Sequence, residues 1–517
     1  MDNTLALLLA DGYKHVHAEQ FPKGLTKLVS YMTPRKTRLE NWQHMVFFGL
    51  QAFCQKYLVD YFDEYFFKKP LETIVEEYTD VLDPMLGKGN YDLRKVIELH
   101  KLGYLPITVS GLREGALVPM QVPCIEVTNT DDDFAWVVQW VESLMSCELW
   151  KSCIHANVAL SYRMVVDKYY DETVDDSIDR TKAISDFGFR GMSSLEEAVK
   201  ASTAWLTSFS GTATIPAIPY IERYYHQKNK EDHFATNAIS TEHSVMASNF
   251  SIDGDERTFV KRLLTEVYPH ASFSMVSDTY DYWNMVDVIL PSLKDEILAH
   301  DGKLLIRPDS GNIIDISVKT IQHLWETFGG TVNSKGYKVL DPHIGCVYGD
   351  GVTQLRAERI YEELKQLGFA ANNIVFGAGS FSFNCIETVD ADGNHHFGPF
   401  TRDTLSIAIK ATAGVVNGKF IEIFKDPKTD HVAGCNFKKS QRGVCKVWFD
   451  KDLHDYRCVD RQTELAVWHP TSEDESNDAF RTYFTDGKVK TEYTLQDVRD
   501  NIRDGLNRLG ERKPHTI

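Results

Sequence analysis

The amino-acid sequence predicts an α/β protein centred on a barrel, or a barrel-like sheet, of parallel strands. From about residue 183 onward, short β-type runs that end in polar or glycine-rich turns alternate with helical patterns. The successive turns begin 23 to 42 residues apart, which is about the length of one strand–helix unit. Seven such units in succession imply parallel strands and a barrel-like arrangement. With 517 residues the chain is too long for one compact core, so we expect a second structural unit.

The first third of the chain lacks this rhythm and mixes helical with strand-like patterns. Residues 47–66 are rich in aromatic side chains and predict a helix, and residues 105–127 predict short strands that end at Gly or Pro. Residues 136–164 predict one or two long amphipathic helices.

The barrel region then supplies seven strand ends with helices between them. The strand ends are expected at SDFGFRG (185–191), SFSGTAT (208–214), STEHS (240–244), MVSDTYD (275–281), LIRPDSGN (305–312), VYGDG (347–351) and FGAGS (376–380). The intervening helical patterns cover residues 193–205, 256–267, 317–328 and 354–367.

Composition excludes several classes of protein. The formal charge of −18, from 56 Lys and Arg against 74 Asp and Glu, repels nucleic acid, so a bound phosphate must meet a local cationic pocket. No apolar run reaches the length of a membrane span, and the N-terminus does not resemble a secretory signal, so we expect a cytoplasmic protein. The nine cysteines include no CxxC pair, which favours buried free thiols over disulfides or structural zinc.

Charged side chains recur at the predicted strand ends. In a parallel barrel the residues at the carboxyl ends of the strands face the ligand, while the buried strand bodies need only apolar side chains. Each of these residues taken alone could instead cap the following helix, but Arg and His are not N-cap residues. The set comprises Asp186, Arg190, His243, Asp278, Arg307, Asp309 and Asp350.

Two of the motifs are suited to phosphate and to a sugar. The glycines of FGAGS (376–380) allow the backbone to approach an anion at a helix start, although a plain tight turn is the alternative. In IRPDSGN (306–312), Arg307 and Asp309 occupy alternate positions of an extended segment and therefore can face one side. Arginine binds phosphate or stacks on a ring, and the carboxylate binds hydroxyls or stabilises positive charge; a salt-bridged turn is the competing interpretation.

The remaining motifs add a stacking surface and an acid–base group. Phe187 offers a face for a planar base and Arg190 a partner for phosphate or carboxamide, although a core Phe and a surface Arg are commoner individually. His243 is suited to proton transfer or to accepting a phosphoryl group, and Asp350 to hydroxyls or to Mg²⁺ beside phosphates. Together these groups are suited to ribosyl transfer, whose transition state resembles an oxocarbenium ion that carboxylates stabilise.

In order along the chain, LLLADGYKHVH, FFGLQ, SDFGFRGMSS, TEHS, SDTYD, IRPDSGN, GDGV, FGAGS, TRDT and IFKDPKTD resemble the motifs of nicotinamide phosphoribosyltransferases of bacterial or phage type. The resemblance covers nearly the whole chain. It implies a type II phosphoribosyltransferase of NAD salvage: an irregular βα barrel (151–400) with a second α/β domain built from residues 1–150 and 401–517. It also implies a homodimer with shared active sites.

The resemblance further implies roles for individual residues. Phe187 and the partner's Tyr13 would sandwich the pyridine ring, Arg307 would position the carboxamide, and Asp309, Asp278 and Asp350 would serve the ribose and the ring nitrogen. His243 would be phosphorylated by ATP, and Mg²⁺ would accompany the phosphates. The remaining substrate-binding residues implied are Gly379, Ser380 and Arg402 for the 5′-phosphate, Arg190, Arg35, Lys410, Lys425 and Lys438 for the pyrophosphate, and Asp11, Ser274 and Gly349.

Two departures from the family pattern leave alternatives open. The family usually has GTDT, whose aspartate accepts a hydrogen bond from the nicotinamide –NH₂, whereas this chain has GTAT with Ala213. The stretch 381–400, with two Asp and two His side chains, is longer than usual. The main expectation is nicotinamide plus phosphoribosyl pyrophosphate. The alternatives are transfer of nicotinamide to ADP-ribose pyrophosphate giving NAD directly, use of nicotinate, or a catalytically inactive nucleotide sensor.

Overall fold

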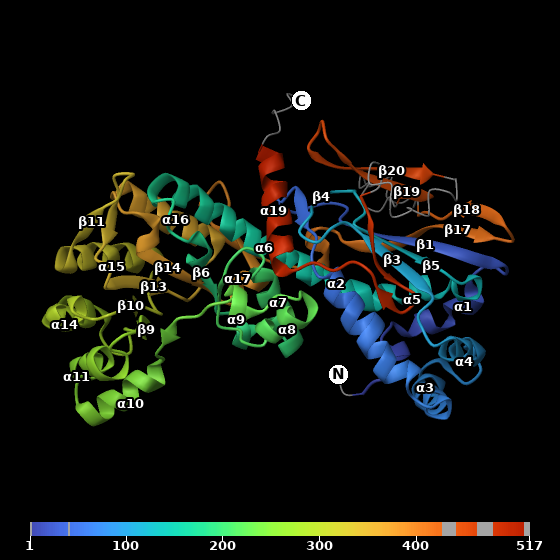
Figure 1. The fold of residues 1–517 in the computed structure, drawn as a ribbon, viewed down its shortest axis with the longest axis horizontal. Coiled ribbons are helices and arrows are strands. Elements are labelled where there is room, and N and C mark those ends of the chain that lie inside the picture. Colours follow the sequence, from blue (N-terminus) through green and yellow to red (C-terminus); the bar gives the residue numbers. More distant parts are fainter. Residues whose placement is uncertain (1–2, 40–41, 426–440, 463–478, 511–517) are drawn as a thin grey trace. The chain divides into compact units, whose positions relative to one another are not determined.

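The computed structural model describes residues 3–39, 42–425, 441–462 and 479–510 (Figure 1). The chain divides into two compact units. Unit 1 comprises residues 1–157, 221–227 and 401–517, and unit 2 comprises residues 158–220 and 228–400.

Unit 2 is built on a parallel sheet of seven strands. Their order is β7-β6-β14-β13-β10-β9-β8, and each pairing between neighbours is parallel. All seven predicted strands are therefore confirmed, together with the α/β fold class. The strands are β6 (Ile184–Asp186), β7 (Gly211–Thr212), β8 (Ile239–Ser240), β9 (Phe273–Val276), β10 (Leu304–Arg307), β13 (Ile344–Tyr348) and β14 (Ile374–Ala378).

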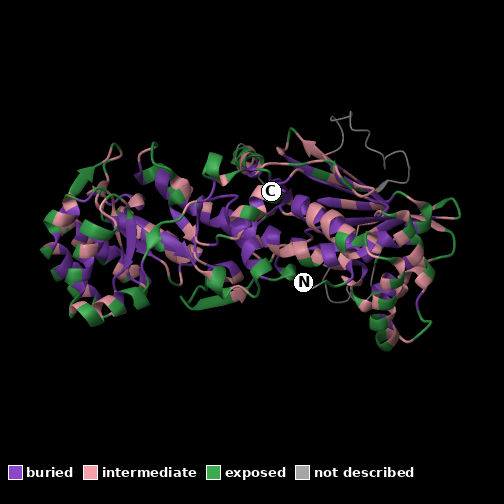
Figure 2. Cartoon of the chain, turned by 60° about the horizontal axis from the view of Figure 1, so that its bottom comes forward, coloured by how far each residue is buried: buried purple, intermediate pink, exposed green. Residues whose placement is uncertain are grey.

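A short segment connects the two edges of this sheet. Thr236 forms a parallel bridge with Gly211 of β7, and three residues later Ile239 of β8 pairs with Phe273 of β9. The backbone pairing thus runs around the sheet, which makes it an irregular barrel. Figure 2 shows that most strands of this sheet are buried. Every residue of β9 and β13 is buried, whereas both residues of β8, at the sheet edge, are exposed.

The four predicted helices of unit 2 are present around the strands (Figure 1). Helix α15 begins four residues before the predicted start because the Asn312 side chain accepts hydrogen bonds from the backbone N–H groups of Ile314 and Asp315 and so caps the helix earlier. The four are α7 (Leu195–Trp205), α11 (Glu256–Arg262) continuing into η8 (Leu263–Val267), α15 (Ile313–Phe328) and α16 (Gln354–Gln366). The other helices are α8 (Ala217–Tyr224), α9 (Asn229–Asp232), α10 (His243–Asp253), α12 (Tyr282–Asn284), η9 (Met285–Ile289), α13 (Leu290–Ser292), α14 (Lys294–Leu298) and α17 (Ser380–Asn384).

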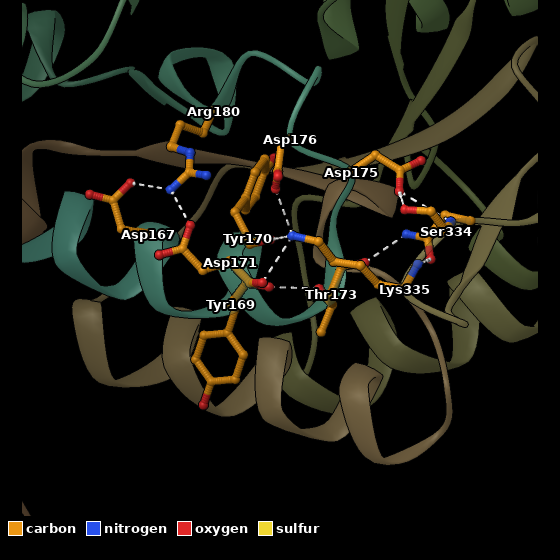
Figure 3. A network of polar contacts seen from close by, with 11 residues as sticks. Asp167, Tyr169, Tyr170, Asp171, Thr173, Asp175, Asp176, Arg180, Ser334 and Lys335 are labelled. Atoms are coloured by element: carbon orange, nitrogen blue, oxygen red, sulfur yellow. Dashed lines mark hydrogen bonds and ion pairs between the residues drawn. The ribbon is translucent and has the colours of Figure 1, made fainter.

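The predicted helices of 136–164 are α5 (Val137–Trp140) and the much longer α6 (Glu142–Thr173). The last carbonyls of a helix lack intrahelical partners, and Lys335 meets this need at the end of α6 (Figure 3). Its Nζ donates to the Asp171 carbonyl at 2.9 Å and also contacts the Asp176 carboxylate at 2.8 Å. Arg180 reaches back to Asp171 at 2.7 Å. These contacts fix the chain where it leaves α6 and enters β6.

Unit 1 contains a seven-stranded antiparallel sheet to which both ends of the chain contribute. The order is β18-β17-β1-β5-β3-β21-β22. At its centre, Leu25–Thr33 pairs along its length with Ala408–Val416. The strands are β1 (Leu25–Thr33), β3 (Ile107–Gly111), β5 (Ile125–Asn129), β17 (Ala408–Val416), β18 (Lys419–Glu422), β21 (Arg481–Thr485) and β22 (Lys488–Val489). Separate pairs are β2 (His44–Val46) with β4 (Leu117–Pro119), and β19 (Val444–Asp450) with β20 (Asp455–Gln462).

The aromatic-rich helix predicted at 47–66 is confirmed, but its hydrogen bonding is wider than that of an α-helix. It begins as α2 (Leu50–Phe53) and continues as the π-helical segments η3 (Cys54–Tyr61) and η4 (Asp63–Phe67). The other helices of unit 1 include α1 (His17–Gln20), α3 (Leu71–Leu86), α4 (Leu93–Leu102) and α19 (Leu495–Gly510). Among the described residues, no helix combines the length and apolar character needed to cross a bilayer.

A buried carboxylate holds the start of α2 in unit 1. Glu114 is fully buried and accepts hydrogen bonds from the Gln51 backbone N–H at 2.7 Å and the Tyr225 hydroxyl at 2.9 Å. Burial raises the pKa of Glu114 to about 7, although these hydrogen bonds lower it. The folded chain therefore keeps a proton that the unfolded chain has already released.

Because folded and unfolded chains differ in the protonation of Glu114, the free energy of unfolding is expected to depend on pH. Between the ordinary carboxyl pKa of 4.5 and about pH 7 the unfolded state binds fewer protons, so stability falls as the pH rises. We expect the free energy of unfolding of the native protein, measured relative to Glu114→Gln by denaturant titration, to fall by about 3 kcal/mol across this window. A difference that stays constant with pH would contradict the assignment.

Candidate active site

Most of the predicted site residues of unit 2 lie at or just beyond the carboxyl ends of the parallel strands, whereas Ser274 lies within β9 and Arg190 follows β6 by four residues. Because all seven strands run in one direction, these ends share one edge of the sheet. Arg307 ends β10, and the others follow their strands by one to three residues. In chain order they are Phe187 after β6, Ala213 after β7, His243 after β8, Asp278 after β9, Asp309 after β10, Gly349 and Asp350 after β13, and Gly379 and Ser380 after β14.

An imidazole and two carboxylates form the centre of this edge. His243 Nε2 lies 3.8 Å from Asp278 Oδ1 and 3.9 Å from Asp309 Oδ2, while its Nδ1 is 3.1 Å from the Thr279 hydroxyl. Asp278 Oδ2 accepts from the Asp309 backbone N–H at 2.9 Å and from the Ser310 hydroxyl at 2.6 Å. The backbone that follows β10 is thus hydrogen-bonded to the carboxylate that follows the neighbouring strand β9.

One carboxylate oxygen of this centre can still accept a hydrogen bond. Asp278 Oδ1 is buried and has no hydrogen-bond partner within the described part of the chain. The buried hydroxyl of Ser274, on β9 of the same sheet, also has none there. Buried polar groups are normally hydrogen-bonded, so such orphaned atoms indicate a site completed by a ligand.

A third carboxylate and two guanidinium groups share this environment. Burial raises the pKa of Tyr348 to about 12, and the nearby Asp350, Asp309 and Asp278 carboxylates contribute to the rise. Arg307 donates to the Ser240 hydroxyl at 2.6 Å and to the Thr241 carbonyl at 2.9 Å. Burial lowers the pKa of Arg307. The Asp309 and Asp278 carboxylates act in the opposite direction and raise this pKa, whereas the positive charge of Arg190 lowers it further. Carboxylates and guanidinium groups therefore lie together at the carboxyl edge of the parallel sheet, as ribosyl phosphate chemistry requires.

The Phe187 ring lies against glycine backbone. A Cβ atom added to Gly377 would come within 2.1 Å of the ring, and one added to Gly349 within 3.0 Å. Only glycine at these two positions therefore leaves room for the ring. Phe187 is half-buried, and its backbone N–H donates to the Ala378 carbonyl at 2.9 Å. The ring is thus seated on strand ends and provides a fixed surface for stacking.

The turn that carries Arg190 packs against the FGAGS loop. A Cβ added to Gly191 would meet Ser380 Oγ at 1.9 Å, so η7 (Phe189–Gly191) and the start of α17 are in direct contact. Arg190 is exposed, and a Cβ at Gly379 would meet nothing within 4 Å. A cationic side chain, a hydroxyl and an accessible backbone are therefore available together for a phosphate.

In unit 1, a second set of predicted residues gathers around Glu142, at the start of α6. Lys410 Nζ lies 3.1 Å from Glu142 Oε1, and Lys14 Nζ lies 2.5 Å from Oε2. Tyr13 is 57% exposed, and its hydroxyl donates to Asp11 at 3.3 Å. Burial and then Asp11 raise the pKa of Tyr13.

Arg35 and Arg402 belong to the same set. Arg402 lowers the pKa of Tyr13, and burial and then Arg402 lower the pKa of Arg35, so the three side chains are neighbours. Sequence reasoning missed Glu142, which no motif marks, and it assigned no role to Lys14, although Lys14 lies within the LLLADGYKHVH motif. Lys425 follows β18, and Lys438 lies outside the described residues.

The long stretch 381–400 forms a hairpin of β15 (Cys385–Val389) and β16 (His395–Pro399). The buried Glu387 carboxylate accepts from Thr353 and contacts Arg356 at 3.0 Å and His395 at 2.7 Å. In the turn, Asp390 accepts from the Asn394 backbone at 2.8 Å. Glu387 therefore anchors the hairpin to the start of α16 and also contacts His395, whereas Asp390 and His396 contact each other within the hairpin.

No group of three or more His, Cys, Asp or Glu side chains is arranged to hold a metal ion in the described ranges. This arrangement is compatible with Mg²⁺ that is bound mainly through substrate phosphates and water, because Mg²⁺ commonly takes only one or two protein carboxylates. The orphaned Asp278 Oδ1 is an oxygen donor of the required kind.

Comparisons with known proteins give two family matches. Residues 182–488 match the model of the nicotinate phosphoribosyltransferase (NAPRTase) family, and residues 5–83 match the nicotinamide phosphoribosyltransferase N-terminal domain. The chain is similar to nicotinamide phosphoribosyltransferases of Acinetobacter baylyi (35% identical, 96% of both chains covered) and Mycoplasma pneumoniae (31% identical, 82% of this chain and 92% of the relative). The structure resembles human nicotinic acid phosphoribosyltransferase with a TM-score of 0.57, at 14% identity over 97% of this chain and 94% of the other.

Proposed function

This chain belongs to the nicotinate phosphoribosyltransferase family, and we propose that it is the member that transfers a phosphoribosyl group to nicotinamide, yielding nicotinamide mononucleotide and pyrophosphate for NAD salvage. The observation that carries this proposal is the relative named nicotinamide phosphoribosyltransferase, which aligns over 96% of both chains. The match to the N-terminal domain of that name supports the amide as the substrate.

The unit 2 site supports the reaction through its charges. The pyridine nitrogen of nicotinamide bonds to C1 of the ribose as the bond from C1 to the pyrophosphate oxygen breaks, and the electron pair leaves with pyrophosphate. Phe187 would stack on the pyridine ring and Arg307 would hold the carboxamide. Asp309 and Asp278, which flank His243, would stabilise the positive charge that develops on the ribose.

The family resemblance assigns polar and cationic residues to the phosphates. The residues assigned to the 5′-phosphate are Gly379, Ser380 and Arg402, and those assigned to the pyrophosphate are Arg190, Arg35, Lys410, Lys425 and Lys438. We propose a homodimer in which Tyr13 of one subunit completes the stacking site of its partner. The exposure of Tyr13 beside the cationic set of unit 1 supports this assignment.

We further propose two ligands that the family resemblance implies. Mg²⁺ would neutralise charge on the pyrophosphate, with Asp278 as its protein ligand. His243 would accept the terminal phosphoryl group of ATP at Nε2, with ADP as the leaving group, because Nδ1 lies 3.1 Å from the Thr279 hydroxyl while the two carboxylates stay 3.8 and 3.9 Å from Nε2, beyond hydrogen-bond distance.

A product assay tests the proposed function. The purified full-length protein is incubated with nicotinamide or nicotinate, each with phosphoribosyl pyrophosphate or ADP-ribose pyrophosphate, and the products are measured by mass spectrometry. We expect nicotinamide mononucleotide from the first base and first donor as the fastest product. Faster formation of NAD or of nicotinate mononucleotide would replace the proposal by the corresponding alternative.

The preference for the amide gives a prediction at Ala213. An aspartate there would accept a hydrogen bond from the nicotinamide –NH₂ and repel the nicotinate carboxylate, whereas alanine does neither. We expect a smaller preference for nicotinamide over nicotinate than in relatives with the aspartate. Ala213→Asp should raise the ratio of the two kcat/KM values by about tenfold.

The control is Ala213→Asn, which adds similar volume without charge and should sharpen selectivity less. Strong selectivity in the native enzyme that Ala213→Asp leaves unchanged would show that position 213 does not contact the amide.

A further inference from the structure

Asp186 ends β6 directly before the stacking residue Phe187. Its side chain is 2% exposed and accepts three hydrogen bonds. Oδ1 accepts from the Gly188 backbone N–H at 2.7 Å, and Oδ2 accepts from the hydroxyls of Thr212 at 2.9 Å and Thr214 at 2.8 Å. One buried carboxylate therefore holds two different strand ends.

The direction of every hydrogen bond around Asp186 is determined. The Thr212 oxygen accepts from the Thr214 backbone N–H at 2.9 Å, and its own proton goes to Asp186. The Ser202 hydroxyl, 2.8 Å away on α7, must therefore donate to Thr212. The Gly188 N–H and the Thr212 and Thr214 hydroxyls therefore all donate to the Asp186 carboxylate. A neutral asparagine of the same shape could not accept all three hydrogen bonds, because its –NH₂ group is a donor.

The two strand ends held in this way carry the residues that border the base. Gly188 follows Phe187, and Thr212 and Thr214 flank Ala213. The main chain adds a further link, since the Ala213 N–H donates to the Asp186 carbonyl at 2.9 Å. The parallel register pairs Asp186 with Thr212, so the next residues, Phe187 and Ala213, are neighbours.

We propose that Asp186 is a positioning residue that fixes Phe187 and Ala213 relative to one another and so determines how tightly the base is bound. The proposal rests on the proposed function, which places a planar base on Phe187. Asp186 is not assigned a contact with the base itself, because its two carboxylate oxygens are occupied by the Gly188 N–H and by the Thr212 and Thr214 hydroxyls.

The test compares Asp186→Asn with Asp179→Asn. Asp179 makes the same kind of contacts, accepting from the Thr181 N–H at 3.0 Å and hydroxyl at 2.7 Å, but it lies before β6 and is exposed. We expect Asp186→Asn to raise the KM for nicotinamide by about tenfold, because charge-assisted buried bonds are lost, and to leave the KM for phosphoribosyl pyrophosphate within about twofold. Asp179→Asn should change neither.

Hydrogen exchange provides a readout that does not need turnover. In Asp186→Asn the backbone amides of 187–191 and of 211–215 should exchange faster together, whereas a local effect would change only one segment. Thr214→Val keeps the carboxylate and removes one donor, so it should raise the KM for nicotinamide by about threefold and retain the fold.

Two outcomes would overturn the proposal. In the first, Asp186→Asn lowers the Tm and changes the KM for nicotinamide and the KM for phosphoribosyl pyrophosphate by the same factor, which would indicate a structural role only. The other is exchange that is unchanged in either segment. Failure of the proposed function looks different, since the native protein would then form no nicotinamide mononucleotide while the exchange of the two segments still reports on Asp186.

Discussion

Asp309→Ala is expected to lower kcat by about a thousandfold or more, because a carboxylate that faces developing positive charge in a sheltered site contributes about 4 kcal/mol to transition-state stability. Arg307→Ala should be comparably inactive. Asp309 follows β10 rather than lying in its body, and its side chain is about one-third exposed. The fold therefore does not depend on this side chain, and Tm should stay close to the native value.

The matched control is Asp315→Asn, six residues further along the same segment. Asp315 is exposed in the first turn of α15 and is 72 residues from His243 in the chain, with no assigned role at the site. Its replacement should leave steady-state kinetics unchanged. If Asp309→Ala kept near-native activity while folded, the assignment of the strand-end carboxylates would be wrong.

Mixing two inactive variants, Tyr13→Ala and Arg190→Ala, should restore activity from near zero to about a quarter of the native value, as expected for a symmetric dimer with shared sites. Random subunit exchange makes half of the dimers hybrid. Each hybrid contains one site with both defects and one site with neither. The measurement is steady-state activity against time after mixing, with exchange verified by native mass spectrometry of a tagged subunit.

The control pair is Arg190→Ala with Arg307→Ala. Both residues belong to unit 2, so every site in every hybrid retains a defect, and no activity should return. Equal recovery in the two mixtures, or none in either after verified exchange, would count against a site shared between subunits.

The barrel could be predicted from the sequence because strands such as β9, β10, β13 and β14 are short, mainly apolar runs followed by polar or glycine-rich turns, whereas β7 and β8, of two residues each, are indicated by their turns alone. The antiparallel sheet of unit 1 could not be predicted in the same way. Residues 25–33 and 408–416 each have the character of a strand, but nothing local indicates that they pair with each other. Helix α6 extends nine residues beyond the predicted end at 164, because polar contacts such as those of Lys335 hold its last turn.

The same distinction applies to the site. His243, Asp278 and Asp309 stand out as charged residues after apolar runs, and the structure brings them within 4 Å of one another. Asp186 was noted as a strand-end charge, but its partners are two threonines whose hydroxyls carry no sequence signal. Glu142 is hidden for a similar reason, since the lysines that it contacts are 128 and 268 residues away in the chain.

The interleaving of both chain ends in one sheet has a consequence for synthesis on the ribosome. Strands β1, β3 and β5 emerge early, but the strands that flank them, β17 and β21, begin only at residues 408 and 481. The nascent chain therefore carries unpaired strand edges throughout translation of unit 2, whose parallel sheet is formed by strands between residues 184 and 378. Unit 2 is expected to fold first, and a chain released early by a premature stop codon would expose the edges of β1 and β3 and be prone to aggregation.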